Sequence, residues 1–194
     1  MQGVRSVQQY RAIDGSLFAL ILIVFESVIV KAAVMWFPRE AWTVSAVPVI
    51  TAIVMVRWGP WCAVHALIGG VVTVLMMKGN GIQYLVYGVG NLAVLAVWPF
   101  QKKWGWEALH RNVLLNFLFA ALTVLAMQAG RALVALATGT PVNELHLFVT
   151  SDSITYIFTL VILWIAARLD GILEEQTHYL KRINDSEKNK EGYR

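Results

Sequence analysis

The chain has 194 residues, of which 58% are hydrophobic and only 14% are charged, whereas a soluble domain carries about a quarter charged residues. Its formal net charge of +4 does not indicate a nucleic-acid-binding protein, because the basic residues flank apolar runs that are long enough to span a bilayer. The single cysteine, Cys62, excludes a disulfide within the chain and a CxxC metal site.

Six apolar runs, bounded by charged residues, Pro and Gly, predict transmembrane helices. They cover about residues 16–37, 43–56, 61–77, 82–100, 113–138 and 153–167. The second run contains Pro48 and reaches only about 21 Å at 1.5 Å per residue, so we expect it to be buried beside a cavity. The expected fold is all-α, an integral membrane bundle of six transmembrane helices. It forms one domain over residues 1–194 with a charged tail from about residue 170.

Lysines and arginines in the short loops predict the orientation of the bundle. If both termini are cytoplasmic, the inner side holds most of them: Arg5, Arg11, Arg57, Lys102, Lys103, Arg111, Arg168, Lys181 and Arg182. The outer loops then hold only Arg39 and Lys78. We therefore expect a multi-pass protein of the plasma membrane with both termini in the cytoplasm.

Polar side chains form stripes in the outer halves of three expected helices. The stripes are Tyr84, Tyr87 and Asn91 on the fourth helix, Gln128 and Arg131 on the fifth, and Asp152, Thr155, Tyr156 and Thr159 on the sixth. Because polar groups that face lipid are costly, we expect the stripes to surround an outward-opening pocket, in which Arg131 contacts an anionic or strongly accepting group of a ligand. The alternative is a closed polar core with Arg131 paired to Asp152.

Three further residues are candidates by position. Glu26 lies near the bilayer midplane in the first helix, where an ionisable residue is either functional or hydrogen-bonded between helices. Glu144 and His146 lie in the longest outer loop, residues 139–151, which is either a lid over the pocket or an ordinary solvated loop. These two residues supply too few ligands for a metal site. His65 is expected to be a satisfied core histidine.

Catalytic patterns are absent from the sequence. There is no HExxH, GxSxG or P-loop motif, and no cluster of Asp and His. We therefore expect no enzyme activity, no catalytic residue, no cofactor and no metal. Without a nucleotide site the chain cannot couple ATP hydrolysis by itself.

Three stretches of the chain carry a resemblance to a known family. They are Arg57-Trp58-Gly59-Pro60 through Gly69-Gly70, Asn80-Gly81 with Gln83-Tyr84 through Asn91-Leu92, and Tyr156 through Leu169-Asp170-Gly171. In these stretches the chain resembles the substrate-binding S components of energy-coupling factor (ECF) transporters, which are small six-helix proteins that capture vitamins and related micronutrients.

The resemblance implies a high-affinity binding subunit of an ABC importer, with ligands entering from outside between helices four, five and six. The expected ligand-binding residues are Tyr84, Tyr87, Asn91, Gln128, Arg131, Asp152, Tyr156, Glu144, His146 and Glu26. The implied partners are the small-molecule substrate, a membrane-embedded T subunit, two ATPase subunits and the lipid bilayer, but no nucleic acid. Gly15 and Ala19, four residues apart, stand where the family docks on its T subunit through an AxxxA pattern.

Two other classes of protein remain open. A membrane scaffold of the MreD type has the same architecture without a ligand, and it needs no polar pocket. A membrane enzyme that acts on lipids needs a catalytic cluster at an interface, which the sequence does not contain. Retention of a small molecule by the purified protein would separate the binding subunit from the scaffold.

Overall fold

The computed structural model describes the backbone of residues 6–37 and 44–191, and the side chains up to residue 185. The topology markers Arg5 and Arg39 lie outside the described residues, as does the first residue of the expected second span. The described residues form helices and turns but no strand. In chain order the elements are α1 (Val7–Trp36), α2 (Val47–Trp58), η1 (Gly59–Trp61), α3 (Cys62–Met77), α4 (Gly81–Tyr84), η2 (Leu85–Val89), η3 (Leu92–Val97), α5 (Trp98–Arg111), α6 (Val113–Ala137), η4 (Val142–Glu144), α7 (Leu147–Thr150), α8 (Ser153–Ala166) and α9 (Gln176–Glu191).

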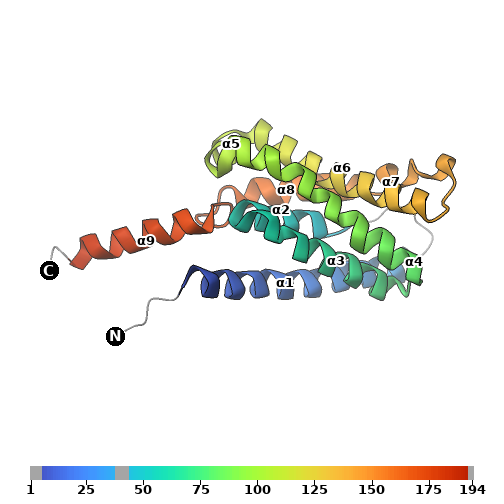
Figure 1. Ribbon diagram of the computed structural model, residues 1–194, viewed down its shortest axis with the longest axis horizontal. Coiled ribbons are helices and arrows are strands. Elements are labelled where there is room, and N and C mark those ends of the chain that lie inside the picture. Colours follow the sequence, from blue (N-terminus) through green and yellow to red (C-terminus); the bar gives the residue numbers. More distant parts are fainter. Residues whose placement is uncertain (1–5, 38–43, 192–194) are drawn as a thin grey trace.

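Within the described residues, five helical stretches are long and apolar enough to cross a membrane. They are Val7–Trp36, Val47–Met77, Gly81–Arg111, Val113–Ala137 and Val142–Ala166. The second stretch is a hairpin, because the chain turns at Gly59 with a φ of +61°. Beyond this turn Gly69 of α3 packs on Val47 at the start of α2, so close that a Cβ on Gly69 would lie 2.6 Å from the valine methyl carbons. With α2 and α3 taken separately, the predicted all-α membrane bundle of six helices is confirmed (Figure 1).

Helix α2 is the centre of the bundle. Its 12 residues reach only about 18 Å, and every residue from Val47 to Arg57 is buried. By contrast, α1 exposes large apolar side chains such as Leu20, Phe25 and Val28, which suit contact with lipid tails. The prediction of a short, buried second helix is therefore confirmed.

The helices that carry the polar stripes cross at glycines. Gly70 of α3 meets the backbone of Tyr87, and Gly130 of α6 meets the carbonyl of Gly90. A Cβ on Gly90 would lie 2.7 Å from the Cα of Arg131. Small residues allow helix backbones in a membrane to approach this closely. The crossing point includes the π-helical turn η2, so its register brings Tyr87 and Asn91 toward α6.

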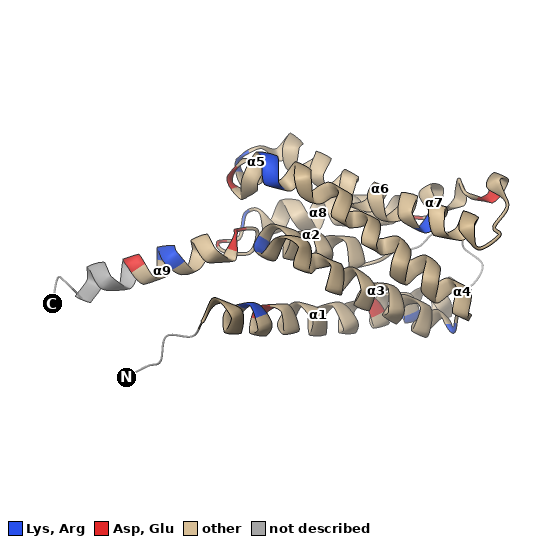
Figure 2. Cartoon of the chain, in the orientation of Figure 1, with Lys and Arg blue, Asp and Glu red and all other residues tan. Residues whose placement is uncertain are grey.

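One end of the bundle, called here the termini end, holds both ends of the described chain (Figure 1). At this end Asp14 of α1 accepts bonds from Arg57 Nε at 2.8 Å, Arg57 Nη2 at 2.9 Å and Trp58 Nε1 at 2.6 Å. Arg57 Nη1 also donates to the carbonyl of Gly171, which follows α8. Charged residues gather mainly toward the two ends of the bundle (Figure 2). The described basic residues of the predicted inner side lie at the termini end, whereas the position of that end relative to the cytoplasm stays a prediction.

Candidate functional site

The structure brings five of the predicted site residues together around Arg131 of α6. Arg131 Nε donates to Asn91 Oδ1 at 2.7 Å, and Nη1 donates to Asp152 Oδ2 at 3.2 Å and to Gln128 Oε1 at 3.5 Å. The guanidinium carbon lies 4.7 Å from the centre of the Tyr87 ring. We call Tyr87, Asn91, Gln128, Arg131 and Asp152 the Arg131 cluster.

The Arg131 cluster is closed to solvent on nearly every side. Arg131 is 3% exposed and Asp152 is 4% exposed, and Asn91 Nδ2 donates in turn to the carbonyl of Ala66 at 3.2 Å. At Arg131 the structure therefore shows the closed alternative, an ion pair with Asp152. The Nη2 atom of Arg131 makes no hydrogen bond to the described part of the chain. A role of these residues in binding a ligand stays a prediction.

A cavity of about 380 Å³ lies next to the cluster, at the end of the bundle opposite the termini. Tyr87 belongs both to its wall and to the Arg131 cluster. The other walls are contributed by α4, the end of α6 and the loop that holds η4 and α7. They include Gln83, Ala135, Glu144, Phe148 and Ser151. We call this space the loop-end cavity, and the loop 139–151 covers one side of it.

The remaining predicted site residues lie apart from this centre. Tyr84 is partly exposed and His146 is exposed, and neither lines the loop-end cavity. The Tyr156 ring is partly exposed, but its hydroxyl is buried and has no hydrogen-bond partner among the described residues. Within the Arg131 cluster, the Gln128 Nε2 atom is likewise buried and without a partner among the described residues.

Glu26 has a separate structural task. Its carboxylate accepts bonds from the Ala46 backbone N–H at 2.7 Å, from the Thr73 hydroxyl at 2.7 Å and from the Ser45 hydroxyl at 3.0 Å. Helix α2 begins at Val47 inside the bundle, where no water reaches its first N–H groups. Glu26 supplies hydrogen-bond acceptors at this helix N-terminus. Glu26 of α1 is therefore hydrogen-bonded to the start of α2 and to α3, as one of the two expectations for this residue stated.

Sequence reasoning did not identify the partners of Arg57 and Glu26. Asp14 is 43 residues from Arg57, and Ser45 and Thr73 are 19 and 47 residues from Glu26, so no local spacing links them. The start of α2 carried one usable signal, since Ser45 precedes Pro48 at the beginning of an apolar run. His65 is also only half satisfied. Its Nε2 atom bonds the Gly15 carbonyl at 2.9 Å, whereas its buried Nδ1 has no partner among the described residues.

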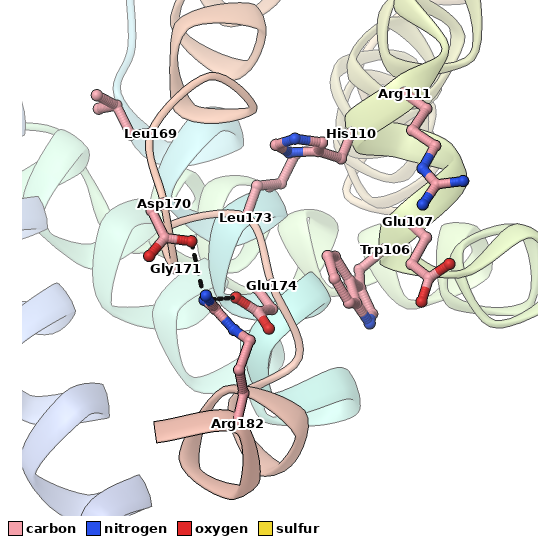
Figure 3. A pocket seen from close by; sticks show the side chains of 10 residues that line it. All are labelled: Trp106, Glu107, His110, Arg111, Leu169, Asp170, Gly171, Leu173, Glu174 and Arg182. Carbon is pink, nitrogen blue, oxygen red and sulfur yellow. Dashed lines mark hydrogen bonds and ion pairs between the residues drawn. The ribbon is translucent and has the colours of Figure 1, made fainter. Parts of the chain in front are cut away.

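Two clefts lie at the termini end. The first, of about 320 Å³, separates α5 from the segment between α8 and α9 (Figure 3). Its Arg182 donates to Asp170 and Glu174, both at 2.8 Å, and these two acceptors raise the pKa of Arg182. These three charged groups therefore satisfy one another. The second, of about 410 Å³, contains the predicted docking residues Gly15 and Ala19.

Among the described residues, no group of three or more His, Cys, Asp or Glu side chains could hold a metal ion. No protein-family model matches the chain, and neither a curated protein nor a solved structure matches it.

Proposed function

We propose that the chain is the substrate-binding subunit of an ECF-type importer, which captures a small, flat, vitamin-like molecule at the loop-end cavity. The observation that carries the proposal is the shared position of Tyr87, which lines a cavity of about 380 Å³ and whose ring centre also lies 4.7 Å from the guanidinium carbon of buried Arg131. A volume of this size lies within the range of small-molecule sites, about 300–1,000 Å³.

The chemistry of the cavity wall favours a flat ligand with a polar edge. Tyr87 and Phe148 offer aromatic surface, and Gln83 and Glu144 offer polar groups. The Arg131 side chain already has Asp152 as its counter-ion. An anionic ligand would have to compete with Asp152, so its contact with Arg131 is favoured only if the cluster rearranges on binding.

The remaining parts of the proposal follow the family resemblance. The termini are cytoplasmic, and uptake needs a T subunit and two ATPase subunits, because the chain has no nucleotide-binding motif. Gly15 and Ala19 lie along a surface groove beside α1, where a partner helix can approach them.

The experiment is native mass spectrometry of the purified protein released from detergent. Wild-type protein is expected to retain a small molecule. Tyr87→Leu should reduce its retention more than tenfold, a loss of about 1.4 kcal/mol, whereas Tyr84→Leu, a tyrosine outside the cavity, should leave it unchanged. An empty wild-type protein, or equal losses for both variants, would contradict the proposal.

A membrane scaffold without ligand is the second candidate. The observation that favours it is the closed Arg131 cluster, in which buried polar groups link α6 to the start of α8 and to Asn91, between η2 and η3. The same measurement separates the two candidates, because a scaffold retains no small molecule in either the wild type or the variants.

A further inference from the structure

The groove at the termini end of α1 contains Gly15 and Ala19, which the proposed function assigns to a partner helix, together with Arg11 and His65, which the proposed function does not use. It is lined by Arg11, Gly15 and Ala19 of α1 and by Trp61, His65 and Ile68, among others, and has a volume of about 410 Å³. We call it the α1 groove. It faces outward, because Trp61 is 51% exposed and Val64, which also lines it, is 45% exposed.

We propose that the α1 groove binds one anionic phospholipid, with the phosphate at Arg11 and an acyl chain along Gly15 and Ala19. This inference rests on the membrane location of the bundle and not on the proposed function. From Gln8 to Ala19 the groove follows α1 for about 16 Å, at 1.5 Å per residue. An apolar groove that opens to a bilayer loses van der Waals contacts if it stays empty, and acyl chains surround it on the outside.

The mouth of the α1 groove is built for a negative charge. The Arg11 guanidinium lies 4.4 Å from the centre of the Trp61 ring, and Arg11 forms no ion pair with the described residues. The neighbouring Arg57, by contrast, is neutralised by Asp14 at 2.8 Å. An arginine on a tryptophan at the membrane interface offers its remaining donors to a lipid phosphate.

The interior of the groove holds a second, independent polar group. His65 is 4% exposed, and its Nδ1 has no partner among the described residues. Because the carbonyl of Gly15 can only accept, the Nε2 atom of His65 carries the proton in that bond. The Nδ1 atom is therefore left for a ligand. It can accept a hydrogen bond from a hydroxyl group of the lipid.

The test is native mass spectrometry of the full-length chain with equal amounts of dioleoyl phosphatidylglycerol and dioleoyl phosphatidylcholine. Wild-type protein should retain the anionic lipid preferentially. Arg11→Gln should retain about fivefold less of it, the effect of one interfacial basic residue. The matched control is Lys103→Gln, because Lys103 also stacks on a tryptophan, Trp104 at 5.3 Å, but lies outside the groove.

Two further arms define the site. Ala19→Leu, which fills the groove, should reduce retention of the lipid without removing Arg11. The soluble head group sn-glycerol 3-phosphate should bind far more weakly than the intact lipid. Equal retention of both lipids, equal effects of Arg11→Gln and Lys103→Gln, or equal binding of the soluble head group would overturn the assignment. The α1 groove would then be left to a partner helix.

Discussion

Arg131 and Asp152 form a buried ion pair inside a membrane bundle, and this environment sets what each residue contributes. Both side chains are nearly inaccessible, at 4% and 6% exposure. Removing water from two charges is costly, so the pair by itself is weak evidence for stability. Removing only one partner, however, leaves the other charge buried and uncompensated, which is strongly destabilising.

We therefore predict that Arg131→Met and Asp152→Asn each lower the stability of the folded bundle by about 3–5 kcal/mol. The measurement is denaturation of the purified protein in detergent. The double variant should lose less than the sum of the two, because the charges interact directly. Lys78→Met, an exposed charge at the end of α3, is the control. Unchanged stability in Arg131→Met, together with lost ligand, would assign Arg131 to the ligand instead.

The contacts of Glu26 give a structural reason for a carboxyl group inside the membrane bundle, whereas its role in ligand binding stays a prediction. Its three donors come from Ser45, Ala46 and Thr73, and the backbone donor belongs to a helix that begins inside the bundle. Position alone made Glu26 a functional candidate. Its role as an acceptor for the start of α2 became visible only when the fold placed Ala46 beside it.

At the scale of elements, the glycines where the helices cross control the geometry of the Arg131 cluster. Gly130 of α6 lies against the Gly90 carbonyl and the Ala93 side chain, and the nearest atom, the Gly90 carbonyl oxygen, belongs to a helix backbone that cannot easily move aside. Gly88 occupies the same π-helical turn region, is buried, and has no atom within 4 Å of a Cβ. Gly130 and Gly88 can therefore be compared by the same substitution, because a Cβ meets close neighbours at Gly130 and open space at Gly88.

We predict that Gly130→Ala lowers the stability of the folded bundle by about 1–3 kcal/mol, which is the typical effect of overpacking a protein core. Gly88→Ala should be neutral or stabilising by up to about 1 kcal/mol, because alanine is the better helix former. Thermal denaturation of both variants in detergent provides the comparison. Equal melting temperatures for the two would show that α6 and the η2 region do not touch at Gly130.

The helices could be predicted from hydropathy, whereas their pairing could not. The apolar runs predicted each membrane helix and the short length of α2, because the presence and length of a helix depend on local composition. The π-helical turn at Leu85–Val89 packs its backbone against Gly70 of α3, a contact between distant segments that no local pattern contains. The periodicity placed Tyr87, Asn91, Arg131 and Asp152 on facing stripes. It could not decide between an open pocket and a closed cluster, because that depends on the distances between helices.

At the scale of the whole molecule, the two ends of the bundle differ in kind. The termini end is tied across three segments by Arg57, which bonds Asp14 of α1 and the carbonyl of Gly171 after α8. The opposite end holds the loop-end cavity beside the loop 139–151. Ligand capture would thus take place at the end that lacks this tie, and the orientation of the bundle decides which side of the membrane that is.

We predict that Thr140 faces the outside of the cell and that Lys181 faces the cytoplasm. Most of the described basic residues lie at the termini end (Figure 2), and lysines and arginines in short loops are retained on the cytoplasmic side. Thr140→Cys and Lys181→Cys would be exposed in turn to a membrane-impermeant thiol reagent on intact cells. The native Cys62 is buried, so only the introduced thiol should react. Thr140→Cys should label at once, and Lys181→Cys only after permeabilisation, which serves as the positive control for both. Labelling of Lys181→Cys but not Thr140→Cys on intact cells would show that the bundle has the opposite orientation. The loop-end cavity would then lie on the cytoplasmic side, where it could not capture an external ligand.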